Sequence, residues 1–291
     1  MKRIGLLWLL SLALLLQGCM TKNPFWESTE TTTGTTTEQT SSSTSEPIVR
    51  PTPNFTYRSA YANQVLGYLS AGVAYLRIMN KSLNQFGDAT YVPQNLVTLD
   101  PNATLGNKEI MLEARAARAL YAMLSEMESD GITSMRVTSG YRDYVRQSEL
   151  YEDYKNKEMQ TISKEAEQLL GYEYLYNKYY ANGLTALDAQ DAEIVANHYS
   201  AQPGTSEHQT GLCVDFMTLY MTALDESFAD TDAFRWLSEN AYRFGFILRY
   251  PSGKTDITGY IYEPWHYRYV GREAAADIHF DNLTLEEYVL G

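Results

Sequence analysis

Two short stretches of the chain carry residue types that bind metals and transfer protons. The first contains His208 and Asp215, and the second, nearer the C-terminus, contains Glu263 and His266. Two imidazoles and one carboxylate supply three protein ligands, which is the number that a hydrolytic zinc site uses while it keeps one position open for water. Glu263 is then a spare carboxylate that could serve as the general base.

The spacing of the first pair predicts a turn between the two ligands. His208 and Asp215 are seven positions apart, so one regular strand would direct them to opposite faces. A helix would place them on one face, but Gly211 and Val214 weaken a helix there. We therefore expect the chain to turn at Gly211 and to enter a strand over residues 213–216.

The second pair also requires a local irregularity. Glu263 and His266 are separated by an odd number of positions, so a regular strand cannot direct both to one side. Pro264 disfavours the helical conformation for Glu263. We expect a kink at this point that turns both side chains inward.

These stretches, Ser-x-His-x-x-Gly-x-x-x-Asp and Glu-Pro-Trp-His-x-Arg-Tyr-Val, resemble the VanY-type D-alanyl-D-alanine carboxypeptidases of bacterial cell walls. Further motifs of that family are matched elsewhere in the chain, at residues 78–81, 91–97 and 139–142, at Gln147, and at residues 285–288. The resemblance covers residues 75–290. Cys213 departs from it, since the family usually has a small apolar residue there. Cys213 could bind stray metal or oxidise, but it should not abolish the site.

The resemblance implies a ligand set and a base. Zinc would be held by His208, Asp215 and His266. Glu263 would deprotonate the attacking water and then protonate the leaving amine. As isolated residues, these four have ordinary structural explanations, but their joint presence in two matching motifs favours the metal site.

Three further residues are candidates for substrate chemistry. Arg142 lies where a strand is expected to turn into a helix, and its position alone is more typical of a surface salt bridge than of a catalytic role. The resemblance instead implies that Arg142 shares with zinc the negative charge that develops in the transition state. Gln147 and Ser206 are candidate hydrogen-bond donors to the substrate.

The resemblance implies an α+β fold, with a small, mostly antiparallel sheet flanked by helices, as in Hedgehog/DD-peptidase-like zinc domains. Apolar periodicity predicts helices and strands independently of it. Helices are expected at residues 57–76, 107–130, from about 143 to 154, at 231–244 and 274–278, with a helical insertion over 155–198 that flanks the cleft. Strands or extended segments are expected at residues 77–80, 96–99, 134–138 and 246–250.

Composition limits the partners of the chain. It has 291 residues and a formal net charge of -13, which argues against nucleic-acid binding and against electrostatic docking on anionic lipid. Of its four histidines, the two outside the motifs, His198 and His279, are interpreted as structural. We expect a monomer.

The N-terminus resembles a bacterial lipoprotein leader. Lys2 and Arg3 precede a short apolar run that is typical of a secretion signal and too short to span a bilayer comfortably. That run leads to Leu-Gln-Gly-Cys, which resembles the lipobox, where the cysteine is acylated after cleavage. We expect a signal peptide over residues 1–18 and lipidation of Cys19; the alternative is an ordinary secretory signal with an incidental cysteine. Cys213 would then have no disulfide partner.

A linker follows the leader. Between Ser28 and Ser45, fourteen of eighteen residues are Ser or Thr. Such a segment cannot bury enough apolar surface to offset its ordering entropy. We therefore expect a disordered linker over residues 19–54 and a zinc carboxypeptidase domain over 55–291. The expected location is the extracytoplasmic face of the bacterial cell membrane, held by the lipid anchor only.

The function expected from the resemblance is removal of the C-terminal D-alanine from peptidoglycan stem peptides by a zinc carboxypeptidase. Two alternatives within the enzymes are an L,D-carboxypeptidase acting on tetrapeptides and a cell-wall endopeptidase. A third alternative is a wall-binding module that has lost catalysis. Such a module would lack a ligand or the base, and neither is missing here.

Overall fold

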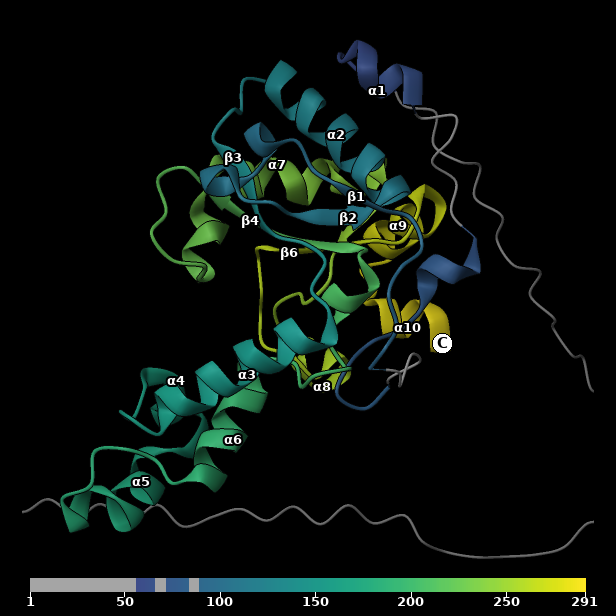
Figure 1. Ribbon diagram of the computed structural model, residues 1–291. Helices are drawn as coiled ribbons and strands as arrows, with labels where there is room; N and C mark the ends of the chain where they lie inside the picture. The colour runs from purple at the N-terminus through teal and green to yellow at the C-terminus, as the bar shows by residue number, and fades with distance from the viewer. Residues whose placement is uncertain (1–55, 66–71, 84–88) are drawn as a thin grey trace, which may run out of the picture. The chain divides into compact units, whose positions relative to one another are not determined.

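The computed structural model describes residues 56–65, 72–83 and 89–291 (Figure 1). The chain divides into Met1–Val49 and Arg50–Gly291, and every described residue belongs to the second unit. The expected signal peptide, the lipidation site Cys19 and the whole linker over residues 19–54 lie outside the described residues. Within the described ranges, no helix combines the length and apolar character required to cross a bilayer.

A four-stranded antiparallel sheet is the centre of the domain, with strand order β3-β4-β6-β5. Its strands are β3 (Met135–Ser139), β4 (Cys213–Thr218), β5 (Phe246–Leu248) and β6 (His266–Tyr269). A separate antiparallel pair joins β1 (Leu96–Thr98) to β2 (Met111–Glu113). The mixture of helices with small antiparallel sheets confirms the expected α+β class.

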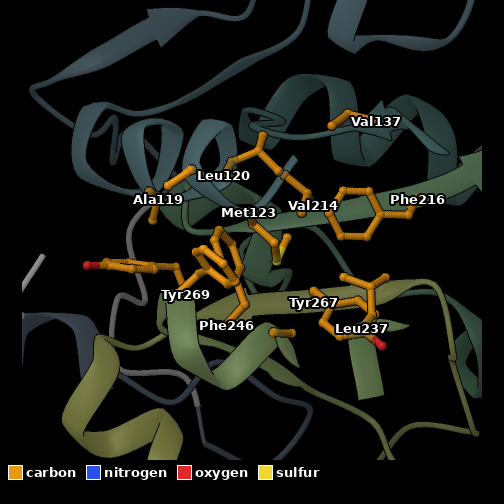
Figure 2. Close-up of a cluster of buried hydrophobic side chains, with 14 of the residues drawn as sticks. Ala119, Leu120, Met123, Val137, Val214, Phe216, Leu237, Phe246, Tyr267 and Tyr269 are labelled. Carbon is orange, nitrogen blue, oxygen red and sulfur yellow. The ribbon is translucent and has the colours of Figure 1, made fainter. Parts of the chain in front are cut away.

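Strand alternation divides the sheet into a core face and a polar face. On β4, Val214 and Phe216 belong to the main hydrophobic core, and on β6 Tyr267 does the same (Figure 2). Because successive side chains point to opposite faces, the residues between them point away from that core. Asp215 and His266 are therefore directed to the other face, where polar chemistry is concentrated.

Helices cover the core face. The long helix α2 (Ala114–Ser129) contributes Ala119, Leu120 and Met123 to the core, and α7 (Asp232–Asn240) contributes Leu237 (Figure 2). The remaining helices outside the insertion are α1 (Ala60–Val65), α8 (Thr255–Thr258), α9 (Arg272–Phe280) and α10 (Leu285–Leu290). Burial of this apolar face fixes the sheet, and with it the polar face that carries the site.

The helix expected over residues 107–130 begins later than the sequence suggested. Residues 111–113 form strand β2 instead, because they pair with β1. The carboxylate of Glu113 then caps α2 by accepting hydrogen bonds from the backbone N–H groups of Arg115 and Ala116, at 2.8 and 3.1 Å. The helix ends at Ser129, just before Gly131, whose φ of 89° is the left-handed conformation expected there.

The insertion expected over residues 155–198 is helical. It consists of the end of α3 (Tyr144–Glu158), followed by α4 (Lys164–Leu170), α5 (Tyr172–Lys178) and α6 (Ala189–Tyr199). These helices bury a small core of their own, which includes Ala166, Leu175, Leu187, Ala192 and Val195. Helix α3 continues four residues beyond its expected end at residue 154.

Several element boundaries differ from expectation. Of residues 57–76, the described part is helical only in α1 and in the 3-10 turn Val73–Leu76. Residues 77–80 form no regular strand. The carbonyls of Tyr75 and Arg77 accept hydrogen bonds from the Arg268 side chain, each at 3.0 Å. The helix expected at residues 231–244 is α7 followed by a 3-10 turn.

Candidate metal centre

A tight turn brings the first two candidate ligands together. Residues 207–210 form a 3-10 turn that Ser206 caps by accepting a hydrogen bond from the His208 backbone N–H at 3.3 Å. Gly211 ends the turn with φ of 66°, and a Cβ there would lie 3.0 Å from Leu96. Strand β4 follows, and Nε2 of His208 lies 3.2 Å from Oδ2 of Asp215. The expected turn at Gly211 is confirmed.

Sheet register supplies the third candidate ligand. Asp215 on β4 is the direct partner of His266 on β6, and directly opposed residues lie close enough for their side chains to meet. Oδ1 of Asp215 lies 2.9 Å from Nδ1 of His266. Ahead of β6, the His266 backbone N–H donates to the Glu263 carbonyl at 3.1 Å, which closes the expected kink around Pro264.

In both histidines, the ring nitrogen that points away from Asp215 has a hydrogen-bond acceptor beside it. Nδ1 of His208 donates to the carbonyl of Gly140 at 2.7 Å, and Nε2 of His266 lies 3.4 Å from the carboxylate of Glu207. A carbonyl and a carboxylate can only accept, so these nitrogens carry the protons. The other ring nitrogens, Nε2 of His208 and Nδ1 of His266, face Asp215 at 3.2 and 2.9 Å. With the protons held on the nitrogens that contact Gly140 and Glu207, these two are the nitrogens left to bind a metal.

The donor set fits a zinc ion. With metal–donor distances of about 2.0–2.1 Å, the donors of one tetrahedral zinc lie about 3.3 Å apart. Oδ2 of Asp215 lies 3.2 Å from Nε2 of His208, and Oδ1 of Asp215 lies 2.9 Å from Nδ1 of His266. All three side chains are buried, so few solvent contacts compete with a metal. The sulfur of Cys213 also lies near, because the donor atoms of His208, Cys213 and His266 fall within 4.8 Å of one another.

Glu263 lies beside this donor set without belonging to it. Its Oε2 is 3.8 Å from Nδ1 of His266, and it lines the same cleft. Burial raises the pKa of Glu263 to about 7; attraction to His266 opposes this rise and repulsion from Asp215 adds to it. A carboxylate with a pKa near neutrality is suited to both accepting and returning a proton.

Arg142 is held in place at the edge of the donor set. Its Nε donates to Gln147 at 3.0 Å, and its Nη1 donates to the hydroxyl of Ser139 at 3.0 Å. Nη1 also lies 3.9 Å from Oδ2 of Asp215. The backbone follows Gly140, where a Cβ would lie 2.6 Å from the Met111 carbonyl oxygen, so only glycine allows this approach. The guanidinium is thus fixed in the cleft by several contacts.

The contacts of Gln147 favour a positioning role over the direct substrate contact that the sequence suggested. Its side chain is buried and is not part of the cleft wall. Its Nε2 donates to the carbonyl of Ala201 at 2.7 Å, which leaves Oε1 as the acceptor for Arg142. Ser206, in contrast, does line the cleft.

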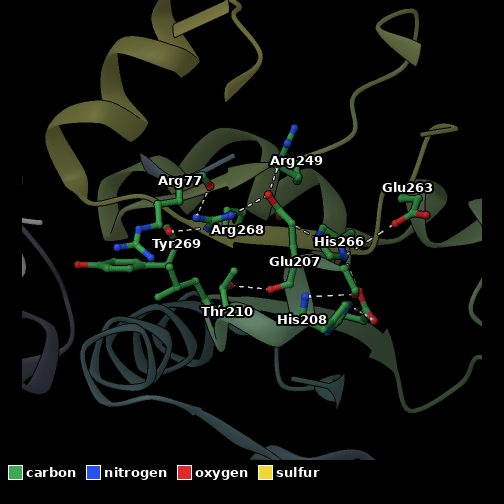
Figure 3. Close-up of polar contacts among 12 residues, drawn as sticks. Arg77, Glu207, His208, Thr210, Arg249, Glu263, His266, Arg268 and Tyr269 are labelled. Atoms are coloured by element: carbon green, nitrogen blue, oxygen red, sulfur yellow. Dashed lines mark hydrogen bonds and ion pairs between the residues drawn. The ribbon is translucent and has the colours of Figure 1, made fainter. Parts of the chain in front are cut away.

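A buried ion cluster behind His266 was not expected from the sequence (Figure 3). Oε1 of Glu207 accepts hydrogen bonds from Nε of Arg249 and Nη1 of Arg268, both at 2.7 Å. Arg249 in turn donates to both carboxylate oxygens of Glu286, at 2.8 and 2.6 Å. Two guanidinium groups therefore neutralise two carboxylates inside the protein, and Glu207 connects them to the metal centre.

The ion cluster also joins distant parts of the chain to the site. Asn80 donates to Glu286 at 2.9 Å, and Arg268 donates to the carbonyl of Arg77 at 3.0 Å. The motifs near residues 78–81 and 285–288 thus meet behind His266. The sequence contains one signal of the ion cluster: a charged residue, Glu207, directly precedes His208 inside the first motif.

The donor set opens into a cleft of about 720 Å³. Tyr154 of α3 and Tyr199 of α6 line one wall, with ring centroids 5.2 Å apart in an edge-to-face arrangement. The helical insertion therefore flanks the cleft, as expected. His198 and His279 are outside the donor set: the backbone carbonyl of His198 accepts from Lys81, and the ring of His279 stacks on Tyr242 with centroids 4.0 Å apart.

Comparisons with known proteins identify relatives of the chain. Residues 109–272, more than half of the sequence, match the family described as VanY, D-alanyl-D-alanine carboxypeptidase. YodJ of Bacillus subtilis (strain 168) is 32% identical over 280 residues, which cover 93% of this chain and 89% of that protein.

Solved structures show the same relationship. A mutant of the vancomycin-resistance D,D-pentapeptidase VanY from a VanB-type cassette, in complex with Zn(II), is 33% identical with a TM-score of 0.54; the match covers 74% of this chain and 98% of that one. VanYB has also been solved in complex with D-alanine-D-alanine. The LD-carboxypeptidase LdcB is 34% identical with a TM-score of 0.53, and the match covers 69% of this chain and 79% of that one.

Proposed function

Because this chain belongs to the VanY family of D-alanyl-D-alanine carboxypeptidases, we propose that it removes the C-terminal D-alanine from peptidoglycan stem peptides. It is a zinc metallo-carboxypeptidase, a hydrolase that needs no catalytic serine. One observation carries the proposal: the nitrogens of His208 and His266 that are free to bind a metal both face Asp215, with Glu263 beside them.

The chain's own residues have distinct roles in this reaction. His208, Asp215 and His266 would hold the zinc ion, which would supply Lewis-acid chemistry to the attacking water and to the peptide carbonyl. Oε2 of Glu263 accepts the proton of the attacking water and later returns it to the nitrogen of the leaving D-alanine. Arg142 donates hydrogen bonds to the oxygen that gains negative charge.

A carboxypeptidase must also recognise the free carboxylate at the end of its substrate. Charge-assisted hydrogen bonds are the strongest way to bind a carboxylate in a cleft. Arg142 and Ser206 line the cleft and are the candidates for this contact, while Gln147 supports it by orienting Arg142. A terminal L-alanine would misplace either its methyl group or its carboxylate.

Three peptides that differ only at the C-terminus test the proposal. One ends in D-alanine, one in L-alanine, and one in D-alanine amide. We expect efficient cleavage of the first only, measured by mass spectrometry after incubation with the enzyme. Comparable cleavage of the amide would refute carboxylate recognition and favour the endopeptidase. Zinc binding without cleavage of any of the three would favour a wall-binding module.

An L,D-carboxypeptidase is the second candidate, because LdcB is as similar to this chain as VanY is. The two activities differ in the residue that precedes the terminal D-alanine. A stem pentapeptide ending in D-Ala-D-Ala and a tetrapeptide ending in an L-residue followed by D-Ala separate them. We expect the pentapeptide to be shortened faster, by one residue, and a reversed preference would establish the second candidate.

We also propose that the enzyme works at the extracytoplasmic face of the bacterial membrane, tethered by a lipid on Cys19. The Leu-Gln-Gly-Cys sequence and the Ser/Thr-rich residues that follow support this location. A doubly acylated cysteine supplies the two chains that stable anchoring requires. Fractionation should find Cys19→Ser in the soluble fraction with catalysis intact. Equal membrane retention of the wild type and of Cys19→Ser would count against lipidation.

A further inference from the structure

Cys213 lies on the face of the sheet that carries the metal donors. It is two positions before Asp215 on β4, so both side chains point to the same face. Val214 and Phe216 of this strand occupy the other face and pack into the core. Cys213 is therefore not one of the apolar contacts that build the core, although its side chain is fully buried.

The thiol is within reach of the same ion as the two histidines. The donor atoms of His208, Cys213 and His266 all lie within 4.8 Å of one another. Donors that share one zinc, with a sulfur at about 2.3 Å and nitrogens at about 2.0–2.1 Å, lie about 3.5 Å apart. A decrease of at most about 1.3 Å in each donor separation therefore brings the sulfur into the ligand set.

Nothing else in the described part of the chain uses this thiol covalently, since Cys213 is not in a disulfide. A buried free cysteine often acts as a small apolar residue. That explanation suits a thiol among aliphatic side chains. Here its close neighbours are two imidazoles, which are themselves zinc ligands in proteins. The surroundings are those of a ligand.

We propose that Cys213 is a fourth protein ligand of the resting zinc site, and that its sulfur must leave the metal before water can occupy the open position. This inference rests on the zinc centre of the proposed function. Four protein ligands close a zinc site, whereas a catalytic site keeps one position open. The thiol gives up its proton to solvent when it binds the metal and takes one up when it leaves.

X-ray absorption at the zinc edge tests the ligand directly. The full chain carrying Cys19→Ser contains Cys213 as its only cysteine. Any sulfur bound to zinc in this protein therefore comes from Cys213 or from a methionine. We expect one sulfur at about 2.3 Å from zinc. Adding Cys213→Ala should leave only nitrogen and oxygen neighbours. Absence of a sulfur neighbour in the Cys19→Ser protein would overturn the inference.

Cobalt substitution gives an independent readout. The cobalt-loaded Cys19→Ser protein should show the near-ultraviolet absorption that arises when a thiolate binds cobalt, and Cys213→Ala should lose it. Release of zinc to a chelator should become at least roughly tenfold faster in Cys213→Ala. Identical spectra for the two proteins would also overturn the inference.

The kinetic consequence is separable from the proposed activity. If the sulfur blocks the open position at rest, the zinc-loaded Cys213→Ala protein should hydrolyse the D-alanine peptide faster than the wild type. A folded, zinc-loaded Cys213→Ala protein with activity equal to or below that of the wild type would contradict a sulfur that blocks the open position. If no peptide is cleaved by either protein, the proposed activity fails, while the sulfur measurement still decides the ligand.

Discussion

Oε2 of Glu207 lies 3.4 Å from Nε2 of His266, while Oε1 of the same carboxylate accepts hydrogen bonds from Arg249 and Arg268 at 2.7 Å each. One buried side chain therefore orients a metal ligand and balances two guanidinium charges. Partners of this kind fix the ring orientation and raise the basicity of the ligating nitrogen. The ion cluster is thus a structural support of the metal centre.

Glu207→Gln should weaken both zinc binding and folding. A neutral amide cannot balance the two arginines, and removal of one partner of a buried ion pair costs about 3–5 kcal/mol of stability. Zinc affinity should fall roughly 10- to 100-fold, because His266 loses its carboxylate partner. Zinc competition with a chelating dye and urea unfolding measure the two effects.

The matched control for this prediction is Glu286→Gln. Glu286 also pairs with Arg249, but it does not contact His266. The Glu286→Gln variant should therefore be less stable than the wild type, while its zinc affinity stays close to that of the wild type. Unchanged zinc affinity in Glu207→Gln would show that the carboxylate does not support the metal ligand.

The same cluster predicts a loss of stability in acid. Burial alone would raise the pKa of Glu207, but Arg249 and Arg268 outweigh it and hold that pKa well below its usual value. A depressed pKa stabilises the fold above the unfolded-state pKa, about 4.3 for a glutamate, and this stability is lost as pH falls below it.

Urea unfolding of the metal-free chain between neutral pH and pH 3 measures this dependence. The free energy of unfolding should decrease as pH falls below about 4.3. The decrease should be smaller in Glu207→Gln, which has no carboxylate to protonate at this position. Parallel pH curves for the two proteins would argue that Glu207 does not contribute through its charge.

Glu263→Gln should retain zinc and lose activity. The amide cannot accept a proton from the attacking water, and loss of a general base costs about 10²- to 10⁴-fold in rate. Because Glu263 is outside the donor set, metal analysis should still find one zinc per chain. Glu239→Gln, which removes a carboxylate from the exposed side of α7, controls for the change in net charge. A Glu263→Gln enzyme with full turnover would disprove the assignment of the base.

Arg142 and Gln147 should act as one unit. Arg142→Lys removes the planar fork that reaches Ser139 and Gln147 together, and kcat should fall by about 10²- to 10³-fold. Gln147→Leu should lower kcat less, through misplacement of Arg142. In the Arg142→Lys background, Gln147→Leu should add little further loss, as expected for coupled residues. Additive losses in this double-mutant cycle would indicate that Gln147 acts independently of Arg142.

The donor set could be predicted from the sequence because its parts are local. His208 and Asp215 are separated by one glycine turn, and Glu263 and His266 by one proline kink. Strand alternation then makes the sheet direct Asp215 and His266 to one face. The main helices and strands were predictable for the same reason, since apolar periodicity records which face is buried.

The ion cluster could not be predicted, because its partners lie far apart in the chain. Glu207, Arg249 and Glu286 are charged residues of types that are usually exposed, and only their mutual pairing makes their burial favourable. Strand β2 was missed for a related reason. Its residues fit a helical pattern, and pairing with β1 overrides that pattern.

The central claim is that one zinc ion, held by His208, Asp215 and His266, is required for release of D-alanine. The most direct measurement is a titration of the metal-free enzyme with zinc while free D-alanine released from a D-Ala-D-Ala pentapeptide is quantified. Release should be absent without zinc, rise in proportion to added zinc, and reach its plateau at one zinc per chain; His208→Ala should show no such rise. Release of D-alanine by the metal-free enzyme, or a normal titration with His208→Ala, would contradict the account.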